Sequence, residues 1–244
     1  FINDYGNVRE IGIAPSCKTA GELMLSYREE LTFDTEDEPE LIPKPNDIDA
    51  FTYMQLRQAR IAAFGIISDR DISIYERLAM YLEYARQIQK HLDTERDELI
   101  ANVAKKFCSF DYRTNELGKL KNNTKMLEKK RLIKGLRCFF DDFPGMEVIN
   151  PDWNIHVKRV RDVLDRLSED KGLTELVREY HRRHSKLEQE YEQLAMYYVY
   201  RYMLDAVNDY DVLLKAKNAV IGILAVDIMA AANEALRKCE EESA

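Results

Sequence analysis

The stretch from Glu188 to Leu236 constrains the fold of this chain more than any other. It contains two helical patterns that meet at Asn208 and Asp209. In the first pattern, apolar and tyrosine side chains recur three or four residues apart, which places them on one helical face. The second pattern, 211–237, is apolar almost all round between 219 and 232, so we expect that helix to be buried.

Two charged residues lie inside this apolar stretch. Arg201 is surrounded by tyrosines, and Asp227 interrupts the apolar run. Because an unpaired buried charge is very costly, we expect both side chains to be largely buried and paired, either with each other or with partners such as Asp205 and Lys215. The pattern is compatible with a structural ion-pair lattice in a helical core and with an aromatic pocket that contains carboxylates.

The rest of the chain predicts an all-α protein. Nine Gly and six Pro in 244 residues leave little turn material for many strands, and helical patterns dominate from Asp49 onward. Ser73 and Glu76 have the spacing of a capping box, which predicts a helix start. We therefore predict an irregular multi-helix bundle of about eight helices with a buried central C-terminal helix pair.

Two regions are expected along the chain. Residues 1–46 form an N-terminal segment with one predicted helix, 17–30, followed by an acidic and proline-containing loop between Asp34 and Pro45. That loop has little apolar area to bury, so we expect it to be solvated. Residues 47–244 form the predicted helical domain.

Composition excludes several classes of function. The net charge of −8 argues against general binding of nucleic acid. The longest apolar run, 219–232, contains Asp227 and is predicted to be too short and too polar to span a membrane. The four cysteines are far apart in sequence, which predicts free thiols in a reducing cytoplasm.

Recognisable catalytic motifs are missing from the sequence. It contains no GxG turn, no P-loop and no HExxH motif. His181 and His184 have a spacing that metal ligands use, but the neighbouring positive charges disfavour a cation there. The predicted helix 116–140 carries a run of basic residues in an otherwise acidic chain. Residues 119–137 are therefore a candidate docking surface for an acidic protein partner.

Several stretches together resemble the flagellin lysine-N-methylase family. The resemblance covers most of the chain and keeps the family's order and separation of segments, although Lys18 stands where the family usually has proline. The segments are SCKTAGELML at 16–25, NDID at 46–49 with the arginines at 57 and 60, RDISIYERLAMYLE at 70–83, EVINPDW at 147–153, YEQLAMYYVYRYMLDAV at 191–207 and DVLLKAKNAV at 211–220.

The resemblance implies methyl transfer from S-adenosylmethionine to lysine side chains of flagellin. Tyr198, Tyr202 and Asp205 are then candidate catalytic residues, since aromatic faces and a carboxylate lower the cost of handling a lysine amine. Arg201 is a candidate for binding the carboxylate of the methyl donor. Asp227, like Asp205, is a candidate for orienting the amine or for binding the donor's ribose. The alternative is a non-catalytic helical module that binds its partner through 119–137.

The family also has a cysteine-rich N-terminal segment that resembles an iron–sulfur or metal site. This chain is expected to begin just after that segment, and residues 233–244 are short and charged where the family continues. Cys17 matches a cysteine that follows the cluster segment. It is therefore either a remaining metal ligand or a buried thiol at a helix start. The four scattered cysteines predict a chain without an iron–sulfur chromophore.

Overall fold

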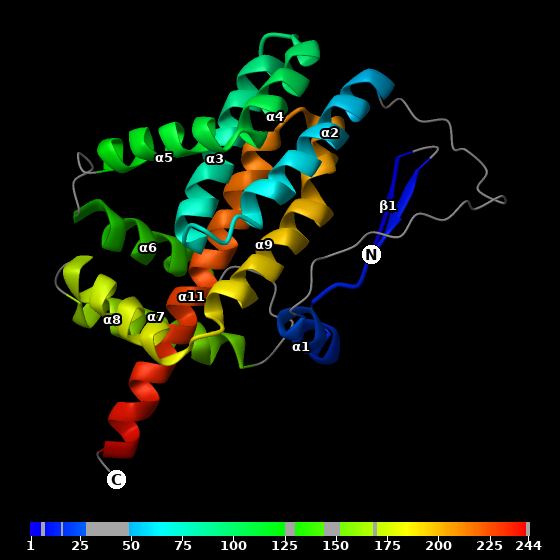
Figure 1. Cartoon of the computed structure of the whole chain (residues 1–244). Coiled ribbons are helices and arrows are strands. Elements are labelled where there is room, and N and C mark those ends of the chain that lie inside the picture. The colour runs from blue at the N-terminus through cyan, green and yellow to red at the C-terminus, as the bar shows by residue number, and fades with distance from the viewer. Residues whose placement is uncertain are drawn as a thin grey trace. The chain divides into compact units, whose positions relative to one another are not determined.

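The computed structural model describes residues 1–5, 8–15, 17–27, 49–124, 130–143, 152–167 and 170–242 (Figure 1). Helices account for well over half of these residues, and the described strands form one small two-stranded sheet. The predicted all-α class is confirmed. The described residues contain helices labelled α1 to α11, so the prediction of about eight helices was too low.

The elements follow one another in this order: β1 (Ile2–Asp4), β2 (Arg9–Ile11), α1 (Lys18–Ser26), α2 (Ala50–Ile67), α3 (Ile74–Leu92), α4 (Ile100–Cys108), α5 (Phe110–Thr124), α6 (Lys130–Asp142), α7 (Trp153–Arg166), α8 (Asp170–Arg183), α9 (Leu187–Tyr202), α10 (Ala206–Asp209) and α11 (Val212–Glu242). Two 3₁₀ turns, Asp97–Leu99 and Met203–Asp205, precede α4 and α10.

The chain divides into two compact units that do not follow the sequence in one piece. Unit 1 comprises Phe1–Leu120 and Glu188–Val220, and unit 2 comprises Lys121–Leu187 and Ile221–Ala244. The predicted boundary at residue 46 and the acidic loop both fall within 28–48, outside the described residues. Those two expectations stay predictions.

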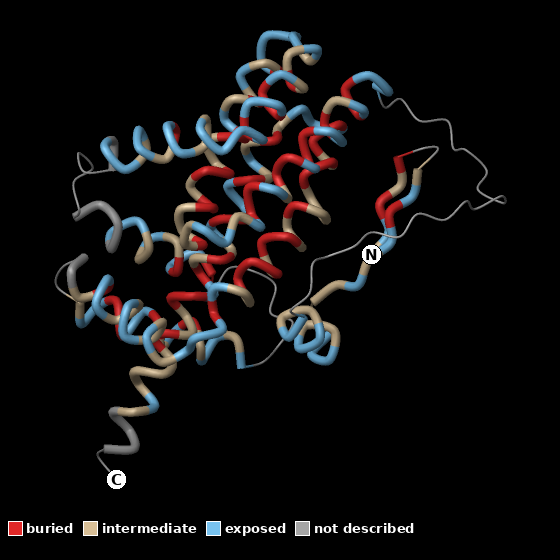
Figure 2. Tube along the Cα trace, viewed as in Figure 1, coloured by how far each residue is buried: buried red, intermediate tan, exposed pale blue. Residues whose placement is uncertain are grey.

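Unit 1 has a core in which α2 packs against α3 and α4. Helix α3 begins with the predicted capping box, because Ser73 Oγ accepts from the backbone N–H of Glu76 and the Glu76 carboxylate accepts from the N–H of Ser73. One face of α3, which includes Leu78, Tyr81, Ala85 and Ile88, is buried (Figure 2). The hydroxyl of Tyr84 on this helix donates to the carbonyl of Ala59 on α2 at 2.8 Å, which satisfies a buried polar group within the core.

The β1–β2 hairpin joins unit 1 through polar contacts. Its strands are antiparallel, with Ile2 opposite Ile11. Glu10 and Arg60 form a buried bidentate ion pair, in which Arg60 Nη1 lies 2.8 Å from one Glu10 oxygen. Arg60 also donates to the carbonyl of Tyr200 at 3.1 Å. A two-stranded hairpin is marginal alone, so these contacts to α2 and α9 hold it in place.

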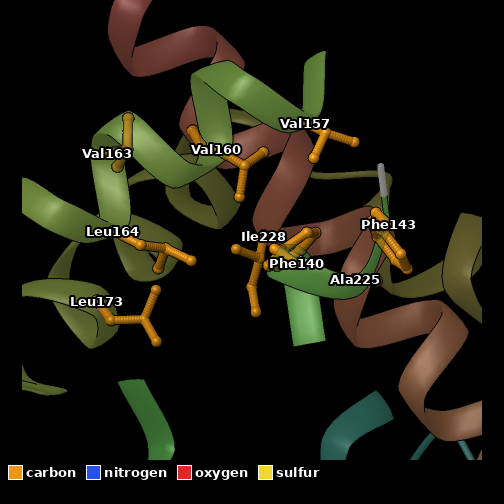
Figure 3. Packing of buried hydrophobic residues seen from close by; sticks show 10 residues of the cluster. Phe140, Phe143, Val157, Val160, Val163, Leu164, Leu173, Ala225 and Ile228 are labelled. Carbon is orange, nitrogen blue, oxygen red and sulfur yellow. The ribbon is translucent and has the colours of Figure 1, made fainter. Parts of the chain in front are cut away.

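Unit 2 is built around a hydrophobic cluster from α6, α7, α8 and the second half of α11 (Figure 3). Phe140 of α6 and Phe143, which directly follows this helix, pack edge-to-face, with their ring centroids 5.2 Å apart. The tryptophan at 153 lies beside Phe143, with a centroid separation of 5.4 Å. The cluster also contains Ala225 and Ile228 of α11.

Helix α11 is the second member of the predicted C-terminal pair. The prediction that this region is too short and too polar to span a membrane considered only the 14-residue run 219–232. By length and composition alone, the longer stretch Val212–Lys238 is long and apolar enough to cross a membrane. We interpret it as a core helix, because its second half packs into the cluster of unit 2. The expectation that this helix is buried is confirmed for much of 219–232, but not for Ile221 and Val226, which are 43% and 46% exposed.

The predicted basic helix 116–140 is found as parts of two helices. Helix α5 begins earlier than expected, at Phe110, and α6 ends at Asp142. Residues 125–129 lie outside the described part of the chain, as do the side chains of 123–133. The docking surface at 119–137 therefore stays a prediction. At its start, Lys119 donates to Glu116 at 2.6 Å.

Candidate functional site

Four of the predicted site residues lie together at the C-terminal end of α9 and in the turn after it. The rings of Tyr198 and Tyr202 are 5.7 Å apart. The guanidinium carbon of Arg201 lies 5.2 Å from the centroid of Tyr202 and 4.3 Å from that of Phe1. Arg201 also donates to the side-chain oxygen of Asn3, whose amide donates back to the Arg201 carbonyl at 3.0 Å. Arg201 thus contacts the N-terminal hairpin in two ways, by stacking on the ring of Phe1 and by hydrogen bonds with the side-chain amide of Asn3.

Asp205 is the carboxylate of this cluster. Its Oδ1 accepts from the hydroxyl of Tyr5 at the long distance of 3.5 Å. Burial raises the pKa of Asp205, and the nearby charges of Arg201 and Lys215 only partly oppose that effect. The hydroxyl of Tyr53, beside the Tyr5 ring, is buried and has no hydrogen-bond partner among the described residues. The cluster therefore contains a carboxylate that is poorly compensated.

Of the two expected alternatives for Arg201, the described contacts favour Asp205, whose carboxylate it affects electrostatically, over Asp227. Arg201 is half-buried, so the expectation that it is largely buried was wrong. Asp227 is buried as expected, with 1% of its surface exposed, but its partner is His181 of α8, whose Nε2 lies 2.9 Å from Asp227 Oδ1. Cys17 is exposed at the start of α1, so the buried-thiol interpretation was also wrong.

Sequence reasoning missed a second constellation in unit 1, between the N-terminal end of α3 and the first turns of α9. Glu192 is the centre of this cluster. It accepts from Arg77 Nη1 at 2.6 Å and from Arg70 at 2.7, 3.0 and 3.2 Å. Glu188, one turn earlier, accepts from Arg77 Nη2 at 2.8 Å and from the backbone N–H of Ile74 at 2.7 Å.

These side chains line an open pocket of about 390 Å³, which also includes Asp71 and Ser73. Its floor is rigid, because the side chains of Arg77 and Glu192 are only 3% and 5% exposed. The other two ionic groups reach solvent, with Arg70 53% and Glu188 48% exposed. The pocket therefore combines a buried ion pair with exposed charges of both signs.

The electrostatics of the cluster favour the ionised form of Glu192. Burial by itself raises the pKa of Glu192, but hydrogen bonds from Arg70 and Arg77 outweigh it, and the pKa is lowered below its usual value. Arg77 also donates to the carbonyl of Ile67 at 2.9 Å, while its Nε has no partner among the described residues. The buried Nε–H of Arg77, beside the pocket, is thus a donor without a hydrogen-bond partner among the described residues.

The pocket and the tyrosine cluster cannot share one reaction centre. Both include residues of α9, and a helical rise of 1.5 Å per residue separates Glu192 from Tyr202 by about 15 Å along the axis. A single methyl group can therefore be transferred at only one of them.

A sequence signal for the pocket existed. Glu188 and Glu192 are spaced four residues apart at the start of an apolar helix, and Arg70 and Arg77 are spaced seven apart across the capping box. Charges at helical spacing on a face that continues into core residues indicate a buried ionic cluster, but the pattern does not say which partners meet.

The described residues do not provide a ligand set for an iron–sulfur cluster. Among the described residues, no group of three or more His, Cys, Asp or Glu side chains is placed to hold a metal ion. Cys17, Cys108 and Cys138 are free and exposed. Cluster ligation requires several thiolates that converge on one point, and these three do not.

Comparison with known proteins identifies a family. Residues 60–242 match the family model described as the FliB lysine N-methylase C-terminal domain. No curated protein and no solved structure matches the chain. The matched range covers three quarters of the sequence and includes every residue that lines the pocket, whereas Phe1, Asn3 and Tyr5 of the hairpin lie outside it. The chain therefore belongs to the FliB lysine N-methylase family.

Proposed function

We propose that this chain transfers methyl groups from S-adenosylmethionine to lysine side chains of flagellin. The observation that carries the proposal is the match of residues 60–242 to the lysine N-methylase domain. The pocket between α3 and α9 supports it, because a rigid ionic floor inside the matched range suits a polar small molecule. We place the reaction there rather than at the tyrosine cluster, whose contacts with Arg201 and Asp205 involve hairpin residues outside the matched range.

The chemistry sets clear demands on the site. A lysine ε-amine has an unperturbed pKa of about 10.4, so it reaches the enzyme as an ammonium and must lose a proton before its nitrogen can attack. The donor, when bound, supplies an electrophilic methyl group on a sulfonium. The nitrogen–carbon bond forms as the carbon–sulfur bond breaks, and the ammonium proton is taken up by a carboxylate or by solvent.

Residues of the pocket suit the binding of the methyl donor, which carries an ammonium group of its own. The carboxylates of Glu188 and Asp71 reach the open mouth, where they can accept hydrogen bonds from that ammonium and orient the donor. Arg77 fixes Glu188 and Glu192 from below through two charge-assisted hydrogen bonds. These bonds fix the two carboxylates in place, so the site is preorganised for binding a cation.

Two further parts of the proposal concern partner and compartment. Flagellin is proposed as the protein substrate because the chain belongs to this family and resembles flagellin lysine-N-methylases. A cytoplasmic reaction is proposed because the cysteines at 17, 108 and 138 are free thiols, as in a reducing compartment.

Methyl transfer is tested by incubating the purified chain with S-adenosylmethionine and flagellin, and by mapping modified lysines with mass spectrometry. We expect methyl-lysine with the wild-type chain and a strong loss with Glu188→Gln. Asp205→Asn tests the competing centre, and we expect it to remain active. Loss of activity in Asp205→Asn with full activity in Glu188→Gln would move the reaction to the tyrosine cluster.

A further inference from the structure

We propose that the pocket between α3 and α9 binds the α-amino-carboxylate end of S-adenosylmethionine, with Arg70 as the anchor of the carboxylate and Glu188 as the acceptor of the ammonium. This assignment rests on the proposed function, because it names where that methyl donor is held. It also replaces Arg201 as the expected carboxylate anchor, since Arg201 is engaged by Asn3 and two aromatic rings.

The anionic end of the ligand matches the unused part of Arg70. Its Nε and Nη2 bind Glu192, and the described residues provide no hydrogen-bond partner for its Nη1. The side chain is 53% exposed and lines the pocket, so a ligand can reach it from solvent. A guanidinium that is already oriented by one carboxylate loses little entropy on binding a second, and its planar donors suit a carboxylate.

The cationic end of the ligand matches the unused part of Glu188. Its Oε2 accepts from Arg77 Nη2 and from the N–H of Ile74, while no contact of Oε1 is found among the described residues. Asp71, which is exposed, lines the same pocket. One fixed oxygen and one nearby carboxylate provide the acceptors that an ammonium with three N–H donors requires.

Net charge favours the methyl donor over its demethylated product. Two guanidiniums and three carboxylates line the pocket, Arg70 and Arg77 against Asp71, Glu188 and Glu192, which leaves one negative charge. S-adenosylmethionine carries one net positive charge because of its sulfonium, and S-adenosylhomocysteine carries none. Attraction of opposite charges near a partly desolvated surface therefore favours the donor and releases the product. The volume of about 390 Å³ is within the usual range for small-molecule sites.

Isothermal titration calorimetry tests the assignment on the whole chain. We expect S-adenosylmethionine to bind the wild type, and Arg70→Ala and Glu188→Gln each to weaken binding by about ten- to a hundred-fold, as expected when one charge-assisted contact is lost. Adenosine, which lacks the amino acid part, should bind all three chains equally. Arg86→Ala is the matched control, because Arg86 is an exposed arginine of α3 that pairs with Glu83 and does not line the pocket.

Folding of each variant is checked by far-UV circular dichroism, and Arg70→Lys replaces Arg70→Ala where the alanine variant fails to fold. Equal donor affinity in the wild type, the Arg70 variant and Glu188→Gln overturns the pocket assignment. If flagellin is then still methylated, the proposed function stands without it. Absence of both donor binding and methylation in the wild type overturns the two proposals together.

Discussion

Replacing Arg77 with methionine tests how much the ionic floor of the pocket stabilises unit 1. The change removes three hydrogen bonds, to Glu192 at 2.6 Å, to Glu188 at 2.8 Å and to the carbonyl of Ile67 at 2.9 Å. Each bond to a charged group contributes about 1.5–3 kcal/mol. Part of this loss is recovered because a buried guanidinium no longer has to be desolvated, and Arg70 still binds Glu192. We expect a net loss of about 3–5 kcal/mol in the free energy of unfolding.

Urea denaturation followed by far-UV circular dichroism measures this loss, and amide hydrogen exchange locates it in α3 and α9. Arg86→Met is the matched control on the same helix, because the Arg86 side chain is 60% exposed and its pair with Glu83 is a surface pair. That control should cost less than about 1 kcal/mol. Equal costs for the Arg77 and Arg86 variants would refute the reasoning that the floor is a buried, mutually dependent ion pair.

Three further outcomes follow from the same contacts. The folded-state pKa of Glu192 is below its ordinary value of 4.5. Its ionised form therefore stabilises the fold above about pH 4.5, and this contribution is lost as the pH falls through the folded pKa. The urea midpoint of Glu192→Gln should therefore depend less on acid pH than that of the wild type. The pKa of Asp205 is raised, so its ionised form is disfavoured in the folded state, and Asp205→Asn should increase the melting temperature at pH 7. Phe140→Ala should cost about 3–5 kcal/mol by leaving a cavity in the cluster of unit 2, and the fluorescence of Trp153 reports that unfolding directly. An unchanged acid dependence, a lower melting temperature or a fluorescence transition at the wild-type midpoint would contradict the respective prediction.

Local sequence signals predicted the local structure well. The scarcity of Gly and Pro and the long helical periodicities indicated an all-α fold, and Ser73 with Glu76 identified the start of α3 to the residue. Such signals are reliable because capping and amphipathicity depend on neighbours within about one or two turns. The burial of Asp227 was predicted for the same reason, since it is surrounded by apolar positions on its own helix.

Partners distant in sequence could not be predicted in this way. Asp227 pairs with His181 across 46 positions, and Arg77 pairs with Glu192 across 115. Periodicity tells which face of a helix is buried, but tertiary packing decides which charges on two buried faces meet. Arg201 illustrates the same limit, because its stacking partner Phe1 and its amide partner Asn3 lie in a hairpin that no helical pattern announces.

The central claim is that this member of the FliB lysine N-methylase family methylates lysine, and one measurement tests it most directly. The purified chain is mixed with flagellin and S-adenosylmethionine that carries an isotopically labelled methyl group, and the flagellin is analysed by peptide mass spectrometry. We expect labelled methyl groups on lysine side chains with the wild type and far fewer with Glu188→Gln at equal stability. Flagellin that stays unlabelled with a folded wild-type chain would contradict the account.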